Sequence, residues 1–232
     1  MTKALVLLSG GCDSATCLGM AVERYGSDGV CAATVSYGQK HAKETSCAVA
    51  LAEHYGVPLH RIDLSGTGIF DGSSCSLLAG ASEEVPDGPY SEQLKSGGVS
   101  TYVPFRNGLL ASAMASLALS IDDDSSWEIW LGAHADDSAG EAYPDCSAQF
   151  VESMSMAIGE GTYGKVSLLA PFVESTKADV VRAGLGLGVP YELTWSCYKG
   201  GERQCGRCGT CIDRKSAFAA NGATDPVPYE IS

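Results

Sequence analysis

Basic residues are scarce in this sequence. Its 232 residues include 15 lysines and arginines against 28 aspartates and glutamates, which gives a formal net charge of −13. A protein that holds a nucleic-acid backbone needs an excess of positive charge, because the phosphates repel an acidic surface. We therefore expect no nucleic acid among the partners of this protein.

Long apolar runs are also lacking. No stretch approaches the roughly 20 residues that a membrane-spanning helix needs. The apolar run after Lys3 is broken at Ser9, which makes it too short for the hydrophobic region of a signal peptide. We expect a cytoplasmic protein with no membrane partner. In a reducing compartment, the ten cysteines favour metal binding or burial over disulfides.

The order of the apolar segments predicts an α/β fold. Short apolar runs that are typical of buried strands alternate with segments of helical spacing, the strands at 5–8, 30–37, 59–64, 127–133 and 166–170 and the helices at 15–22, 40–55, 104–121, 145–158 and 176–184. This alternation indicates a Rossmann-like, doubly wound parallel sheet of about five strands. The stretch 65–103 has no sustained period, which favours a functional loop. We predict an α/β domain over 1–190 and a small C-terminal region over 191–232.

The segment Ser9–Ser14, with the sequence Ser-Gly-Gly-Cys-Asp-Ser, lies between the first predicted strand and helix. It lacks the third glycine of the dinucleotide-binding fingerprint and the Gly-Lys-Ser/Thr ending of the kinase-type phosphate loop. Gly159–Lys165 imitates the second pattern, but Val166 replaces the hydroxyl residue and the segment precedes a strand. Ser9–Ser14 still suits an anion, because glycines allow close approach to the backbone amides at a helix start. An ordinary strand-to-helix turn is the alternative.

Four cysteines near the C-terminus have the spacing Cys-x7-Cys-x2-Cys-x2-Cys among several glycines. They are Cys197, Cys205, Cys208 and Cys211. Thiolates at this density predict one tetrahedral Zn²⁺ site, which is structural because sulfur fills every ligand position. An iron–sulfur cluster is the alternative, although the ferredoxin spacing and its trailing proline are missing. Four unliganded cysteines would fit poorly in so polar and glycine-rich a segment.

Further polar motifs lie where predicted strands end or predicted helices begin. They are Pro104-Phe105-Arg106-Asn107, Gly132-Ala133-His134-Ala135-Asp136-Asp137, Tyr143-Pro144-Asp145-Cys146 and Ser175-Thr176-Lys177. Because ligands gather at the carboxyl ends of parallel strands, the motif that follows the fourth strand is expected at such a site. Three of these residues also have a plainer interpretation. Arg106 and Lys177 would then be solvated surface charges, and His134 would only hydrogen-bond within its own loop.

In combination, these motifs resemble a known family. Ser9–Ser14 is similar to the Ser-Gly-Gly-x-Asp-Ser pyrophosphate loop of the ATP pyrophosphatases, which split ATP into AMP and pyrophosphate. With the other motifs and the cysteine cluster, the chain resembles the 7-cyano-7-deazaguanine synthases nearly from end to end. The resemblance implies an adenine-nucleotide α-hydrolase-like fold, a structural zinc ion and a homodimer. It also implies the conversion of 7-carboxy-7-deazaguanine, ammonia and ATP into the nitrile precursor of queuosine.

The resemblance assigns roles to individual residues as well. It places ATP on the loop and the start of the following helix, at Leu8, Ser9, Gly10, Gly11, Cys12, Asp13, Ser14, Ala15, Thr16, Cys17 and Leu18. The catalytic candidates, which would steady the phosphates or the substrate carboxylate, are Asp13, Ser14, Arg106 and Lys177. The residues expected around the deazaguanine are His134, Asp136, Asp137, Tyr143 and Asp145. Mg²⁺ would help to neutralise the leaving pyrophosphate. Asp136 or Asp137 could hold this ion instead of contacting the deazaguanine.

Three other functions would use some of the same motifs. An ATP pyrophosphatase that modifies tRNA would need a basic face or an RNA-binding domain, which a net charge of −13 opposes. A related enzyme that stops at the amide, or that joins the deazaguanine to a protein amine, would carry the same ATP and zinc motifs and stays open. A binding module without activity is disfavoured, because the loop, Asp136, Asp137 and Lys177 occur together.

Overall fold

A five-stranded parallel sheet forms the centre of the protein. The computed structural model describes residues 1–40, 43–95 and 99–230. The strand order is β3-β2-β1-β4-β5 and every neighbouring pair is parallel, with β1 (Thr2–Leu7), β2 (Val30–Ser36), β3 (Leu59–Asp63), β4 (Ser126–Trp130) and β5 (Val166–Leu169). The predicted doubly wound α/β fold is therefore confirmed.

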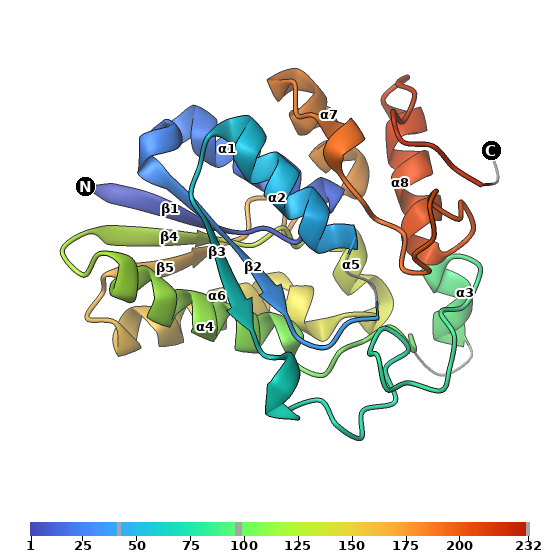
Figure 1. The fold of residues 1–232 in the computed structure, drawn as a ribbon, viewed down its shortest axis with the longest axis horizontal. Helices are drawn as coiled ribbons and strands as arrows, with labels where there is room; N and C mark the ends of the chain where they lie inside the picture. The colour runs from blue at the N-terminus through green and yellow to red at the C-terminus, as the bar shows by residue number, and fades with distance from the viewer. Residues whose placement is uncertain (41–42, 96–98, 231–232) are drawn as a thin grey trace.

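Helices cover both faces of the sheet (Figure 1). The upper face in this view carries α1 (Cys12–Tyr25), α2 (Lys43–Tyr55) and α7 (Lys177–Leu187), with α8 (Gly209–Ala220) packed on α7, and the lower face carries α4 (Arg106–Ile121) and α6 (Ala148–Gly161). Short helices and 3-10 turns complete the connections, at α3 (Tyr90–Lys95), α5 (Ala135–Ser138), Ser27–Gly29, Ser65–Thr67, Ala139–Glu141, Pro144–Cys146 and Tyr191–Leu193. In the part of the chain that the structure describes, no helix has the length and apolar character to cross a membrane.

The central strand β1 contributes to two hydrophobic cores. Ala4 and Val6 pack on one side with the residues of α1, α2 and α7, whereas Leu5 packs on the other side with those of α4 and α6. All three side chains are completely buried. A strand covered on both faces reads as a continuous apolar run instead of an alternating one, which explains why this strand was predictable.

The two halves of the sheet diverge beside β1. From β1 the chain passes to β2 and β3 on one side, then returns to β4 and β5 on the other. In such a sheet the connections leave the carboxyl ends of the two central strands in opposite directions, and a crevice results. The phosphate-loop candidate Ser9–Ser14 follows β1, and the motif 132–137 follows β4. Both therefore lie at this crevice.

The C-terminal region contains a helix that its sequence did not predict. Helix α8 was not predicted, because glycines and cysteines hide its short apolar face. Ala217 and Phe218 on this helix belong to the same hydrophobic core as β1. The boundary between 190 and 191 stays a prediction.

The other predicted elements agree with the structure to within a few residues. The helix expected from Lys40 is observed from Lys43 onward, and residues 41–42 lie outside the described residues. The stretch 65–103 contains, in its described part, one 3-10 turn and α3. It is therefore largely irregular, as its composition predicts.

Candidate active site

A cavity of about 200 Å³ lies at the carboxyl edge of the sheet between β1 and β4. Its wall combines the ends of β1, β2 and β4, the starts of α2 and α4, and the segment before α8. Of the residues predicted from the sequence, the wall includes Leu8, Ser9, Gly11, Asp13, Ser14, Arg106, Asp137 and Tyr143. The structure thus brings residues of several separate motifs together around one cavity, and their individual roles stay predictions.

The Ser9–Ser14 loop turns tightly into α1. Gly10 has a φ of +93°, and a Cβ at this position would lie 2.1 Å from the carbonyl oxygen of Glu44, so only glycine fits. Gly11 is the N-cap of α1 and supplies no side-chain cap. The first amides of α1 therefore stay available for an anion. Ser9 Oγ accepts a hydrogen bond from Gly11 N at 3.2 Å and lies 3.1 Å from Ser14 Oγ.

The remaining residues of the predicted ATP segment point into the protein. They are Cys12, Ala15, Thr16, Cys17 and Leu18, and each is completely buried. Four of them belong to the hydrophobic core, and Thr16 Oγ1 lies 2.7 Å from the hydroxyl oxygen of Tyr191. These residues hold α1 against the sheet, so that the loop before it faces the cavity.

Asp13 forms an ion pair with Lys177. Lys177 Nζ donates to both carboxylate oxygens of Asp13, at 2.5 Å for Oδ1, and Lys177 is 8% exposed. Burial opposes ionisation of Asp13, but Lys177 and then His134 outweigh it and lower the pKa of this carboxyl group. Burial likewise opposes the charge on Lys177, and Asp13 raises the pKa of its ammonium group. Lys177 is therefore a buried partner of the loop and not a solvated surface charge.

Two of the predicted site residues, His134 and Asp136, contact the residues of this ion pair. His134 is buried, and its Nε2 lies 3.4 Å from Asp137 Oδ1 and 3.8 Å from Asp13 Oδ1. The carboxylate of Asp136 accepts a hydrogen bond from the backbone N–H of Lys177 at 2.7 Å. Asp137 lines the cavity, whereas His134 and Asp136 do not. In this structure, His134 contacts its own loop and the neighbouring phosphate loop.

Arg106 presents a positive charge to the cavity from the start of α4. Its Nη1 donates to the hydroxyl group of Tyr37 at 3.2 Å, and its guanidinium carbon lies 5.7 Å from the centre of the Tyr37 ring. Among residues 1–40, 43–95 and 99–230, no carboxylate lies within ion-pair distance of Arg106. A guanidinium without a protein counter-ion is suited to bind the carboxylate or phosphate of a ligand.

Tyr143 and Asp145 follow the strand β4 motif but have different surroundings. Tyr143 lines the cavity, and its hydroxyl oxygen lies 2.5 Å from Thr101 Oγ1. The carboxylate of Asp145 instead accepts a hydrogen bond from the backbone N–H of Asn107 at 2.9 Å. Asp145 thereby fixes the first turn of α4, directly beside Arg106. Contact with the deazaguanine stays a prediction for both residues.

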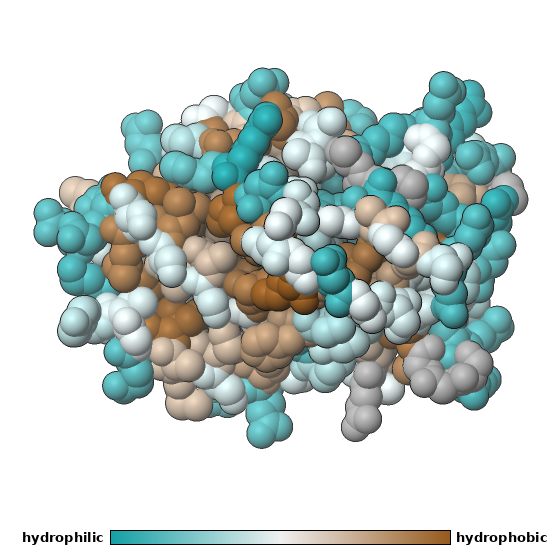
Figure 2. All heavy atoms as spheres, turned by 60° about the horizontal axis from the view of Figure 1, so that its bottom comes forward, coloured by the Kyte–Doolittle hydropathy of each residue, from teal (hydrophilic) through white to brown (hydrophobic). Residues whose placement is uncertain are grey.

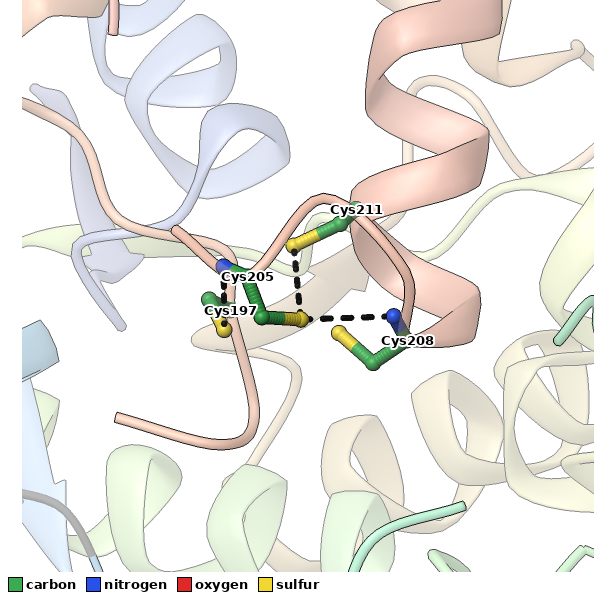
Figure 3. Close-up of side chains that lie close together, drawn as sticks. All are labelled: Cys197, Cys205, Cys208 and Cys211. Atoms are coloured by element: carbon green, nitrogen blue, oxygen red, sulfur yellow. Dashed lines mark hydrogen bonds between the residues drawn. The ribbon is translucent and has the colours of Figure 1, made fainter. Parts of the chain in front are cut away.

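The four predicted zinc ligands converge at the start of α8 (Figure 3). Their sulfur atoms lie within 4.8 Å of one another, and those of Cys205 and Cys211 are 3.9 Å apart. Tetrahedral zinc with Zn–S bonds of about 2.3 Å places its sulfurs about 3.8 Å apart. The backbone N–H groups of Cys205 and Cys208 donate to Cys197 Sγ and Cys205 Sγ, each at 3.3 Å. Both the spacing and these donors fit a structural Zn²⁺ ion.

A short segment joins the cysteine cluster to the phosphate loop. The backbone N–H of Trp195 donates to the carbonyl oxygen of Gly10 at 2.9 Å, and Trp195 Nε1 donates to the carbonyl oxygen of Cys197 at 2.8 Å. Trp195 and Cys197 both line the cavity. Lys43 Nζ lies 4.1 Å from the centre of the Trp195 ring. The metal ligands therefore support one wall of the cavity.

Several cavity residues were not marked by any motif. Tyr37, Glu44, Trp195 and Tyr198 all line the cavity. Tyr37 directly follows β2, and the end of a central parallel strand is a position that points to a ligand site. Glu44 had no such signal, because it is one of several charged residues in the first turns of an amphipathic helix.

Known proteins match this chain along nearly its whole length. The family model described as "Queuosine biosynthesis protein QueC" matches residues 3–222. The 7-cyano-7-deazaguanine synthase of Archaeoglobus fulgidus is 45% identical over 226 residues, which cover 97% of this chain and 89% of that protein. The protein of that name from Caldicellulosiruptor bescii is 42% identical, with 99% of this chain and 98% of that protein covered.

Among solved structures, the NMN synthetase of Francisella tularensis has a TM-score of 0.48 at 14% sequence identity, with 96% of this chain and 78% of that chain covered. Family membership rests on the sequence matches, which span the phosphate loop, the residues of the cavity wall and the cysteine cluster. The chain belongs to the QueC family of queuosine biosynthesis proteins.

Proposed function

We propose that this protein is a 7-cyano-7-deazaguanine synthase, which uses ATP to convert 7-carboxy-7-deazaguanine and ammonia into the nitrile. One observation carries the proposal. A single cavity is lined by the pyrophosphate loop, whose Asp13 is bound by Lys177 of α7, and by Arg106, which forms no ion pair with the described residues. A nucleotide and a substrate carboxylate can therefore meet there. Relatives with this name match at least 97% of the chain.

The proposed reaction activates the same carbon twice, because a carboxylate is a poor electrophile. First, a carboxylate oxygen attacks the α-phosphate of ATP, pyrophosphate leaves, and ammonia displaces AMP to give the amide. Then the amide oxygen attacks the α-phosphate of a second ATP. Loss of AMP and of two N–H protons leaves the nitrile. Both activations place negative charge on departing pyrophosphate, which preorganised backbone amides stabilise.

The residues of this chain divide these tasks by position. The Ser9–Ser14 loop and the first amides of α1 bind the pyrophosphate, and Lys177 keeps Asp13 ionised beside it. Arg106 binds the substrate carboxylate. Mg²⁺, when bound, neutralises phosphate charge, and Asp137 is the candidate ligand because it lines the cavity.

The supporting residues and the base contacts complete this assignment. His134 and Asp136 position the ion pair between Asp13 and Lys177. Tyr143 supplies an aromatic surface for the deazaguanine. Asp145 acts through Asn107 at the start of α4, where it orients the helix that carries the guanidinium group.

The reaction itself can be followed by mass spectrometry. Purified protein with 7-carboxy-7-deazaguanine, Mg²⁺, ATP and ¹⁵N-labelled ammonium is expected to form a nitrile that carries the label, together with AMP and pyrophosphate. Reactions without ammonium or without ATP serve as controls. If the amide accumulates and no nitrile forms, the chain is instead a related enzyme that stops at the amide or conjugates the deazaguanine to a protein amine.

We also propose that two copies of the chain associate. Figure 2 shows hydrophobic side chains gathered over the side of the molecule that carries α4. Ile69 and Phe105 are 56% and 54% exposed there, and they border a shallow groove together with Leu109. An apolar patch of this kind is typical of an interface between subunits.

Sedimentation at micromolar concentration is expected to give about twice the chain mass of 24.0 kDa, because association removes this apolar surface from water. Ile69→Glu should shift the protein toward the monomer. Tyr163→Glu, at a residue that is 95% exposed elsewhere, is the matched control and should not. A monomeric wild-type protein would contradict the dimer.

The cysteines and the net charge bear on the cellular location of the protein and on the class of its substrates. None of the ten cysteines, all of which are described, forms a disulfide, which suits the reducing environment of the cytoplasm. The net charge of −13 suits small substrates better than nucleic acid. We therefore propose a cytoplasmic enzyme that acts on small molecules.

A further inference from the structure

Nitrile formation needs a group that accepts a proton from the amide nitrogen. A carboxylate within reach of the activated carbon is suited to this task. Three carboxylates line the cavity, those of Asp13, Glu44 and Asp137. A carboxylate that already accepts hydrogen bonds or forms an ion pair is less able to accept this proton.

Two of the three carboxylates are already engaged. Both oxygens of Asp13 accept hydrogen bonds from Lys177. Asp137 accepts a hydrogen bond from the backbone N–H of His134, and its other oxygen lies 3.4 Å from the ring of the same histidine. The side chain of Glu44 has neither a hydrogen bond nor an ion pair with the described residues of the chain. Glu44 is therefore the available proton acceptor in the cavity wall.

Glu44 is also held next to the place where the chemistry must occur. It lies in the first turn of α2, and its carbonyl oxygen lies against Gly10 so closely that no Cβ fits between them. The adenylated carbon must lie beside the same loop, because the loop holds the phosphates of the attacked ATP. The backbone contact between Glu44 and Gly10 thus keeps this residue beside the phosphate loop, and its side chain lines the same cavity.

The electrostatic surroundings agree with this role. Burial raises the pKa of Glu44 to about 7, an effect that Arg106 opposes and Cys197 reinforces. The other titratable groups that face Glu44 are Tyr37, Cys47 and Tyr198. A base whose pKa lies near ambient pH can both accept a proton and return it to solvent.

We propose that Glu44 is the catalytic base of nitrile formation, an inference that rests on the proposed function. When the amide oxygen is adenylated, the nitrogen becomes acidic and its first proton passes to water. Glu44 then removes the second N–H proton, and the electron pair of that bond becomes the third bond between carbon and nitrogen. The carbon–oxygen bond breaks at the same time, its electron pair leaves with AMP, and Glu44 later releases the proton to water.

The two halves of the reaction can be tested separately in Glu44→Gln. With the acid, ammonium and ATP, the variant is expected to form amide within about threefold of the wild-type rate, because the ammonia in equilibrium with ammonium attacks the acyl adenylate directly and passes its surplus proton to water. With the amide and ATP, nitrile formation should fall by about 100-fold or more. Amide should therefore accumulate. Glu44→Asp should restore part of the nitrile rate, and Glu53→Gln, at an exposed position of α2, is the matched control.

Each alternative outcome has a distinct meaning. Nitrile formation by Glu44→Gln at the wild-type rate overturns the inference. So does an equal loss of both halves, or a higher KM for the amide at unchanged kcat, since these results indicate folding or substrate recognition instead. Zinc content and ATP binding of the variant report its fold. If the wild-type protein forms amide but no nitrile, the proposed function fails first, and the inference fails with it.

Discussion

Replacement of Asp13 by alanine is expected to lower turnover by about 100- to 1000-fold, comparable to the loss of one preorganised hydrogen-bonding group from an active site. The reason is positional, since Asp13 lies in the phosphate loop and bonds Lys177 through both oxygens. Formation of AMP from ATP, measured with saturating substrate, checks the result. Asp28→Ala, at an exposed aspartate far from the loop, should retain full activity. Full activity in Asp13→Ala would remove this residue from the mechanism.

A second variant separates catalysis from stability at the same site. Asp13→Ala leaves the ammonium group of Lys177 buried without its counter-charge, which destabilises a folded protein. The double variant Asp13→Ala/Lys177→Met removes that buried charge. We expect it to regain thermal stability but not turnover. Recovery of both would show that the single variant had only been unstable.

Loss of the metal is expected to have the largest effect on stability. Cysteine-bound zinc can contribute on the order of 10 kcal/mol to the folding of its segment. Cys208→Ser should therefore lose zinc and unfold at a lower temperature. It should also bind ATP more weakly, because Trp195 connects the ligand Cys197 to Gly10. Metal analysis, thermal unfolding and ATP titration measure the three effects.

A cysteine outside the cluster provides the control for the metal prediction. Cys31→Ser changes a cysteine of β2 outside the cluster and should retain zinc. Iron in the purified protein would overturn the assignment of the metal. Normal ATP affinity in the zinc-free variant would show that the link through Trp195 has no influence on the phosphate loop.

The fold was largely predictable because its strands, helix ends and motifs are each specified by residues that are close together in the sequence. The middle of β1 is buried on both faces, so Ala4, Leu5 and Val6 form a continuous apolar run. At α7, Thr176 caps the helix and Asp179 bonds back to the Thr176 backbone, a pattern that marks a helix start in the sequence. The phosphate loop and the cysteine cluster were predictable for the same reason, since all their residues lie within a few positions of one another.

The contacts across the site could not be predicted, because they depend on the order of strands in the sheet. Asp13 and Lys177 are 164 positions apart in the sequence. The partner of Lys177 depends on the strand order, because Lys177 follows β5 in the chain and Asp13 follows β1. The sequence alone therefore did not show whether Lys177 meets a ligand, a carboxylate or water. Glu44 was missed for a related reason. Its side chain lines the cavity without a hydrogen bond or ion pair to the described residues, and a missing contact leaves no pattern in a sequence.

The close fit at Gly10 links two properties that a protein engineer would prefer to adjust separately. The α-hydrogen that takes the place of a side chain there sets how near α2 comes to the phosphate loop. Any larger residue would displace the helix and the loop together, and with them Glu44. Nucleotide affinity and the position of the Glu44 carboxylate therefore both depend on the small size of Gly10. A variant that binds a bulkier nucleotide at this loop must also find a new position for the group that faces the amide.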